Sequence, residues 1–207
     1  MAARVSRVKA AVRPLPARFF DRDVLVVAQE LIGCVLRHGA CSGVIVETEA
    51  YHHSEPACHA YIGFTPRTAT LFGPPGRAYV YRSYGVHALI NAVCEGEGVG
   101  AAVLIRALYP LEGIELMERR RNTTDRRELC SGPGKLSQAL GVGLSLNGSS
   151  LSSGPLKVYP RHPRFANPPI VRGRRIGISK GTELDWRFAI DGCRFVSKPW
   201  PWRRSSV

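Results

Sequence analysis

The chain has 207 residues and a mass of 22.7 kDa, a length that favours one domain with a substantial hydrophobic core. Its 29 Lys and Arg residues outnumber 16 Asp and Glu residues, and the formal charge of +13 is typical of proteins that bind a polyanion, first nucleic acid and second an anionic membrane surface. No apolar run is long enough for a membrane span, and six scattered cysteines without a CxxC pair argue against a disulfide framework. On charge alone, a basic protein without such a partner remains an alternative.

The N-terminal segment is basic, contains no acid and is interrupted by two prolines. We expect residues 1–16 to form a flexible arm that helps to hold DNA, and a transit peptide is the weaker alternative. Asp21 is then expected to cap a helix whose apolar stripe runs from Val24 to Ile32 and which ends at Gly33.

The stretch from Gly43 to Tyr51 reads as a strand with two different faces, preceded by a shorter strand from Cys34. One face is small and mostly apolar, whereas the other carries Glu47, Glu49 and Tyr51. Two carboxylates and a phenol suit the wall of a cleft better than a core. A merely solvated strand face is the alternative.

A long segment without periodicity covers residues 52–77, and such segments inside compact domains are more often functional than filler. The sequence then predicts a β-hairpin, with strands over residues 78–84 and 86–93 and a turn at Gly85. Tyr79 and Tyr81 share one face of this hairpin, and Tyr84 is expected to project outward at its end.

The C-terminal half predicts further strands and two helices. Strands are expected over residues 101–108, 156–159, 170–179 and 187–190, and helices over residues 112–121 and from Gly132-Pro-Gly-Lys135 to Leu140. Free backbone amides at a helix start beside Lys135 would suit a phosphate group. We therefore expect a single α+β domain over residues 17–199, with a curved, mostly antiparallel sheet, and a loose tail over residues 200–207.

The residue types along the 43–59 stretch suggest chemistry on a nucleotide. A glutamate beside a cleft can take a proton from water, and aromatic rings can sandwich a flat base, holding a cationic base more tightly than a neutral one. A metal site is not expected, because His52, His53, Cys58 and His59 lack the paired spacing of zinc ligands.

Several short motifs occur in a specific order along the chain: VETEAY, CHAY, TPR, FGPPGRAYVY, a YG turn, Asn91, LIRALYPLEG and RELCSGPGKL. In this order, from about Phe19 to Leu140 and more weakly to Pro199, the sequence resembles the alkyladenine (3-methyladenine) DNA glycosylase family. The resemblance implies a base-excision-repair enzyme that flips an alkylated or deaminated purine out of duplex DNA and hydrolyses its N-glycosidic bond, leaving an abasic site. It also implies a single mixed α/β domain without a metal or other cofactor, and we expect a monomer.

Matched by position, the resemblance implies a role for each site residue. Glu49 would activate water, and Arg106 would lie beside the active site and contact the sugar-phosphate backbone. Asn91 would collide with the exocyclic amine of guanine. The ring that enters the gap left by the flipped base would be Tyr84. The flipped base would be lined by Tyr51, His59 and Tyr81.

Arg67, within TPR, and Lys135 are further expected DNA contacts. The chain departs from the family pattern at four positions: Ile62, Phe64, Thr68 and Tyr109.

Two other functions compete with this one. A non-catalytic lesion-binding protein would explain the charge and the aromatic residues. A carbohydrate glycosidase using Glu47 and Glu49 would leave the charge unexplained, and residues two apart on a strand lie roughly 6–7 Å apart and point the same way. No lysine lies near Glu49 in the sequence, so a Schiff-base lyase step is not expected. The expected compartment is the bacterial cytoplasm, at the nucleoid, or the eukaryotic nucleus.

Overall fold

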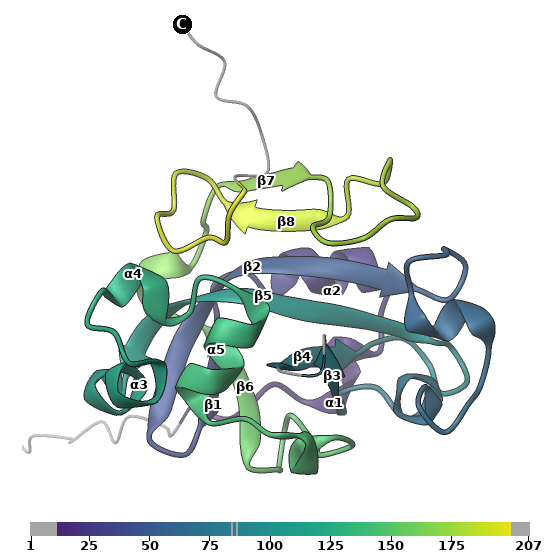
Figure 1. Ribbon diagram of the computed structural model, residues 1–207. Helices are drawn as coiled ribbons and strands as arrows, with labels where there is room; N and C mark the ends of the chain where they lie inside the picture. Colours follow the sequence, from purple (N-terminus) through teal and green to yellow (C-terminus); the bar gives the residue numbers. More distant parts are fainter. Residues whose placement is uncertain (1–11, 84, 86, 200–207) are drawn as a thin grey trace, which may run out of the picture.

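The computed structural model describes residues 12–83, 85 and 87–199 (Figure 1). The expectations for Tyr84, for the first eleven residues and for residues 200–207 lie outside these ranges. The described residues form an antiparallel sheet of eight strands, in which β3, β4, β5, β2, β1 and β6 neighbour one another in that order. β8 also pairs with β2, and β7 pairs with β8. The predicted α+β class with an antiparallel sheet is confirmed.

The strands are β1 Cys34–His38, β2 Cys41–His52, β3 Ala78–Ser83, β4 His87–Val93, β5 Ala101–Glu112, β6 Leu156–Arg161, β7 Ile170–Gly173 and β8 Arg187–Ile190. β2 and β5 are the longest, with 12 residues each, and run side by side across the molecule (Figure 1). Every residue of β2 from Cys41 to Ala50 is buried, because other elements cover both of its faces.

The helices are α1 Ala17–Phe20, α2 Val24–Glu30, α3 Ile114–Arg121, α4 Arg126–Leu129 and α5 Pro133–Leu140, with 3-10 turns η1 His59–Ile62, η2 Ala69–Phe72, η3 Leu144–Leu146 and η4 Pro163–Phe165. Figure 1 shows α3, α4 and α5 grouped on one side of the long strands, whereas α2 lies behind β2. Thr48 joins β2 to α2, since its hydroxyl donates to the carbonyl of Ala28 over 2.8 Å.

The expected N-cap at Asp21 is wrong. Asp23 caps α2 instead, and its Oδ1 accepts the N–H groups of Leu25 at 2.9 Å and Val26 at 3.1 Å. Asp21 is the C-cap of α1, a separate short helix that the apolar stripe did not reveal. Leu15 is already bonded to the domain through its N–H, which donates to Val158 over 2.7 Å.

The expected helix over residues 112–121 begins too early. β5 runs through Pro110 to Glu112, and α3 starts only at Ile114. Pro110 is tolerated because it pairs with Gly43, where the register of β2 and β5 shifts. A Cβ on Gly43 would lie 2.9 Å from both Leu108 Cβ and the Tyr109 carbonyl oxygen, so this close approach requires glycine.

The expected strand over residues 170–179 is too long, because only Ile170–Gly173 pairs, with β8. The residues that follow form a loop that reaches the cavity described below. The expected hairpin of β3 and β4 is confirmed, with Tyr79 opposite Asn91 and Tyr81 opposite Leu89.

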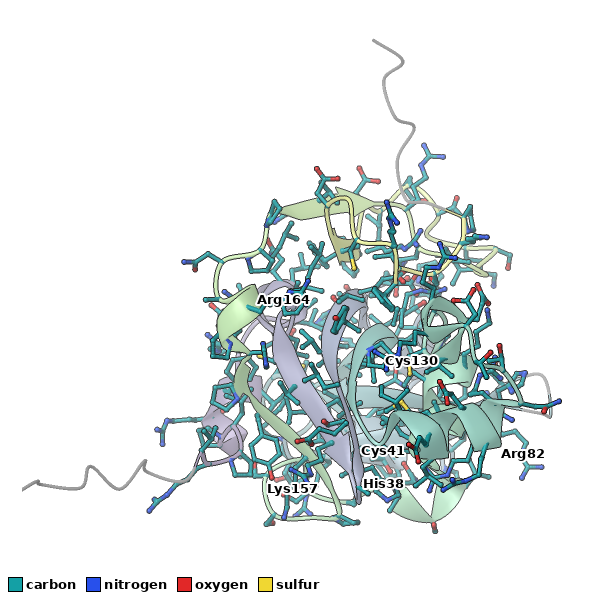
Figure 2. The ribbon with its side chains drawn as sticks, turned by 90° about the vertical axis from the view of Figure 1, so that its left-hand side faces the viewer. His38, Cys41, Arg82, Cys130, Lys157 and Arg164 are labelled. Atoms are coloured by element: carbon teal, nitrogen blue, oxygen red, sulfur yellow. The ribbon has the colours of Figure 1, made fainter. Side chains whose placement is uncertain are left out.

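Two apolar clusters form the interior. The larger lies around β2, β5 and the helices, and the smaller, which includes Cys58, Leu71 and Tyr79, supports the cavity. All six cysteines are free thiols, and Cys41 and Cys130 lie inside the molecule (Figure 2). None of the helices in the described ranges combines the length and apolarity that a membrane crossing requires.

Candidate active site

A cavity of about 660 Å³ opens between the β3–β4 hairpin, strand β5, the start of α5 and two loops. One loop lies between β2 and β3, and the other lies between β7 and β8. Seven of the nine residues expected from the sequence to form the site line this cavity together: Tyr51, His59, Arg67, Tyr81, Asn91, Arg106 and Lys135. Of the other two, Glu49 lies behind the cavity wall, and Tyr84 lies outside the described residues.

Three aromatic side chains form one wall of the cavity. The rings of Tyr79 and Tyr81 are stacked, with centroids 5.3 Å apart and an angle of 26° between their planes. His59 meets Tyr81 edge-on at 4.6 Å, and its Nδ1 lies 3.0 Å from the hydroxyl of Tyr79. These contacts fix the orientation of the rings, and a flat aromatic base could stack on such a wall.

The wall carries no formal charge near neutral pH. Burial and the neighbouring Arg67 lower the pKa of His59 below its usual value, so its imidazole is neutral at pH 7. Burial, together with Tyr79 and Glu49, raises the pKa of Tyr81 to about 12. A cationic group that enters the cavity would therefore face uncharged aromatic rings on this wall, and ring faces attract cations.

Glu49 lies directly behind the cavity wall and is 0% exposed. Its Oε2 accepts the hydroxyl of Tyr51 at 2.8 Å and Nη1 of Arg106 at 3.1 Å. Its Oε1 accepts the N–H of Ile176 at 2.8 Å. All three donors line the cavity, so Glu49 is separated from it by one layer of its own hydrogen-bond partners.

The expectation that Glu47, Glu49 and Tyr51 form the wall of a cleft is therefore correct only for Tyr51, because both carboxylates are fully buried, and the alternative of a solvated strand face is wrong. A buried carboxylate needs paired charges and hydrogen bonds, and this chain supplies both from distant elements. Burial, and then the neighbouring Glu49, raise the pKa of Tyr51 well above its usual value. The phenol is protonated at neutral pH and can act as a donor to Glu49.

Glu47 is equally buried, at 0% exposure, but two of its three partners, Arg187 and Ser197, do not line the cavity. Its Oε1 accepts Nε of Arg187 at 2.6 Å, the hydroxyl of Ser197 at 2.8 Å and Nε of Arg106 at 3.1 Å. Its Oε2 accepts the N–H of Ser197 at 2.7 Å. Glu47 is thus a structural anion that joins β2, β5, β8 and the C-terminal segment.

Arg106 connects the two carboxylates. It is 6% exposed, binds Glu47 through Nε and Glu49 through Nη1, and still contributes to the cavity wall. Burial opposes its charge, but Glu49 and Glu47 outweigh burial and raise its pKa. The register of β2 and β5 shifts on both sides of Glu47, and such bulges re-aim side chains near active sites.

The remaining expected residues lie at the rim or the floor. The Nδ2 of Asn91 donates to the carbonyl of Tyr79 over 3.1 Å, which fixes the amide in the cavity floor. Arg67 is exposed at the rim. Lys135 stands at the start of α5 and forms an ion pair with Glu128. Arg82 also belongs to the rim and points away from the body of the molecule beside the hairpin (Figure 2).

Sequence reasoning missed four residues of the site: Glu55, Arg175, Ile176 and Lys180. Arg175 and Glu55 form a buried ion pair, with Nη1 2.7 Å from Oε1 and Nη2 2.9 Å from Oε2. Only the dense positive charge of residues 172–175 gave any signal for this segment. Lys180 and Lys135 both line the cavity, although no lysine lies near Glu49 in the sequence.

Within the described ranges, no group of three His, Cys, Asp or Glu side chains could hold a metal ion. His52 and His53 lie next to each other, with ring centroids 4.2 Å apart, and His52 is bonded to Ser54.

Comparison with known proteins identifies the family. Residues 18–194 match the family described as Methylpurine-DNA glycosylase (MPG). A protein of Rhodopseudomonas palustris (strain BisB18) is 55% identical over 196 residues, covering 93% of this chain and 96% of the relative. Proteins of Rubrobacter xylanophilus and Methanoculleus marisnigri are 57% identical (82% of this chain, 90% of the relative) and 50% identical (89% and 98%). All three bear the name "Putative 3-methyladenine DNA glycosylase". The chain belongs to the methylpurine-DNA glycosylase family.

Proposed function

We propose that this protein is a DNA repair glycosylase that hydrolyses the N-glycosidic bond of alkylated or deaminated purines in duplex DNA and so initiates base excision repair. The observation that carries the proposal is the position of Glu49, a buried carboxylate whose three hydrogen-bond donors all line an aromatic cavity. Family membership and the formal charge of +13 support DNA as the substrate.

The aromatic wall would bind the flipped base. The rings of Tyr79, Tyr81 and His59 are fixed by mutual contacts, and Tyr51 is a further aromatic residue of the cavity. A purine alkylated on a ring nitrogen is cationic, so ring faces attract it more than a normal base. Asn91 would exclude guanine by a collision with its exocyclic amine, as the family resemblance implies.

Glu49 would act as the general base. A carboxylate oxygen can accept two hydrogen bonds, and Oε1 accepts only the N–H of Ile176 among the described residues. The reacting water would bind Oε1 next to that amide. Its oxygen bonds to C1′ of the sugar, its proton goes to Glu49, and the electron pair of the broken C1′–N bond leaves with the purine. Arg106 and Tyr51 would hold the carboxylate in place.

The rim would hold the DNA. Arg67 and Lys135 carry positive charge at the cavity and would contact phosphates, and Arg106 would face the backbone of the flipped nucleotide. Tyr84 would fill the gap in the duplex. One cavity serves one flipped base, so the enzyme would act as a monomer.

The reaction would stop at the abasic site. A Schiff-base lysine is normally activated by desolvation or by a neighbouring cation. Lys180 is exposed, and Lys135 is paired with Glu128, so neither lysine of the cavity is a desolvated, unpaired amine. Borohydride is therefore expected to trap no covalent complex with DNA.

The test is single-turnover base release from short duplexes that carry one 7-methylguanine, one hypoxanthine or one 1,N6-ethenoadenine. Release of at least one of these purines without strand cleavage would support the proposal and rank the lesions. An active preparation that binds all three duplexes tightly and releases no base would contradict it.

One observation favours a second function, a non-catalytic lesion-binding protein. Glu49 is 0% exposed, so no water reaches its carboxylate in the structure as it stands. Under the glycosylase proposal, DNA binding must open the contact between Glu49 and the cavity. Tight lesion binding without release in the experiment above would favour the second function.

A further inference from the structure

Each of the three donors to Glu49 is itself held by a second group. Arg106 is fixed by Glu47, whose other partners, Arg187 and Ser197, do not line the cavity. Among the described residues, the other two donors, the Tyr51 hydroxyl and the Ile176 amide, make no hydrogen bond with Glu47, Arg187 or Ser197. Both depend on Arg175, which lies immediately before Ile176 and packs against the Tyr51 ring.

Arg175 is 6% exposed and makes contacts in several directions. Nη1 donates to the carbonyl of Ala50 at 3.0 Å and to Glu55 Oε1 at 2.7 Å. Nη2 donates to Glu55 Oε2 at 2.9 Å and to the carbonyl of Gly181 at 3.1 Å. The guanidinium carbon lies 4.7 Å from the centroid of the Tyr51 ring.

These contacts tie together two segments that are far apart in the sequence. One is the end of β2 with the start of the following loop, from Ala50 to Glu55. The other is the loop from Arg175 to Gly181, and both segments contribute to the cavity wall. The bidentate pair has the fork geometry that only arginine provides, so it restricts direction as well as distance.

We propose that Arg175 and Glu55 form a positioning pair that holds the Tyr51 hydroxyl and the Ile176 amide against Glu49, and so sets the direction of that carboxylate in the reaction. The proposal rests on the proposed function of Glu49. Arg175 and Glu55 are positioning residues, because they act on the carboxylate only through other groups.

A purely structural role would have different consequences. Buried ion pairs contribute little net stability relative to apolar replacements, because desolvation offsets their attraction. Their geometry, by contrast, can matter greatly to a reaction, since a misplacement of about 1 Å far from the chemistry can lower a rate about 100-fold. The two roles are therefore separable by comparing rate, binding and stability in the same variants.

The test uses Glu55→Gln, Arg175→Lys and Arg175→Met in the full chain, with Leu36→Ala as the control. Leu36 is buried in β1, away from the cavity, so this control lowers stability without touching the positioning pair. Single-turnover base release and the dissociation constant for a duplex with a non-cleavable abasic-site analogue are measured at a temperature where all variants are folded.

We expect base release to fall roughly 10- to 100-fold in Arg175→Met and less in Glu55→Gln, with the dissociation constant changed by less than about 3-fold. Arg175→Lys keeps the charge but not the fork, so it should restore only part of the rate. Leu36→Ala should leave the rate of folded enzyme unchanged. The double variant Arg175→Met/Glu55→Gln should be no slower than Arg175→Met alone.

Amide hydrogen exchange at Ile176 tests the pair without any turnover. Exchange should be slow in the wild type and in Leu36→Ala, and clearly faster in Glu55→Gln and Arg175→Met. Unchanged exchange at Ile176 in Arg175→Met and Glu55→Gln would overturn the positioning role. So would a rate of base release that falls only in proportion to the stability that the variants lose. A wild type that binds lesions without releasing base would instead overturn the proposed function, and the exchange measurement would still decide the role of the pair.

Discussion

The surroundings of Glu47 and Glu49 differ, although the two carboxylates are two residues apart on one strand and equally buried. Around Glu47, four hydrogen bonds from Arg106, Arg187 and Ser197 occupy both carboxylate oxygens. Around Glu49, three donors stand between the carboxylate and a cavity of about 660 Å³. Burial alone therefore does not separate a structural carboxylate from a candidate catalytic one.

What separates them is where their partners lie. The partners of Glu47 belong to β5, β8 and the C-terminal segment, and they fasten these elements together. The partners of Glu49 also belong to the cavity wall, so a ligand in the cavity could contact them. Arg106 belongs to both regions, so the hydrogen bond that holds it at Glu47 also fixes its position against Glu49.

The largest expected effect comes from Glu49→Gln, which keeps the shape of the side chain and removes the base. Base release should fall about 10²- to 10⁴-fold in single-turnover assays, the range typical of a lost general base. Binding to lesion-containing duplexes, measured by fluorescence anisotropy, should remain within a few fold of the wild type. A rate close to that of the wild type would remove Glu49 from the mechanism.

Glu47→Gln should act on stability. It leaves Arg187 buried without its carboxylate, and breaking a buried ion pair lowers the free energy of unfolding by about 3–5 kcal/mol. Urea denaturation followed by circular dichroism measures this loss. If the unfolding free energy changed by less than about 1 kcal/mol, within the range of surface pairs, Glu47 would not be the anchor described here.

Tyr51→Phe removes one of the two donors to Oε2 of Glu49 and leaves the ring in place. A hydrogen bond to a charged group contributes about 1.5–3 kcal/mol, so base release should slow by roughly 10- to 100-fold. The aromatic contact to the base is kept, and the dissociation constant for lesion DNA should be nearly unchanged. Weaker binding with an unchanged rate would place Tyr51 in base recognition alone.

The smallest expected effect concerns pH, and it arises in the aromatic wall. Burial and Arg67 lower the pKa of His59 in the folded chain, so the unfolded chain binds a proton more readily. The neutral ring therefore contributes stability that is present above the unfolded pKa of about 6.5 and declines as the pH falls through that value. Unfolding free energies at pH 7.5 and pH 5.5 should differ less in His59→Gln than in the wild type. An equal difference in both would show that other groups cause the pH dependence.

Much of the fold could be predicted because its signals are local. Alternation along β3 and β4, the Gly85 turn and the Gly-Pro start of α5 each depend on a few neighbouring residues. The same local reasoning failed for Asp21 and Pro110, because capping and register were decided by contacts outside the segment.

The site was predictable only in part for the same reason. Parity placed Glu47, Glu49 and Tyr51 on one face, but it could not show that the face is buried. The residues that bury it come from far along the chain: Arg106 is 57 positions from Glu49, and Ile176 is 127 positions away. Arg175 and Glu55 are separated by 120 positions, so no local pattern links them.

The most direct test is a comparison of Glu49→Gln and Glu47→Gln in one single-turnover assay on 7-methylguanine duplex, at a temperature where urea titration shows both to be folded. The account predicts that Glu47→Gln keeps a rate within about 10-fold of the wild type, whereas Glu49→Gln loses at least about 100-fold. Equal loss in both variants, or a greater loss in Glu47→Gln, would contradict the assignment of one carboxylate to the fold and the other to the reaction.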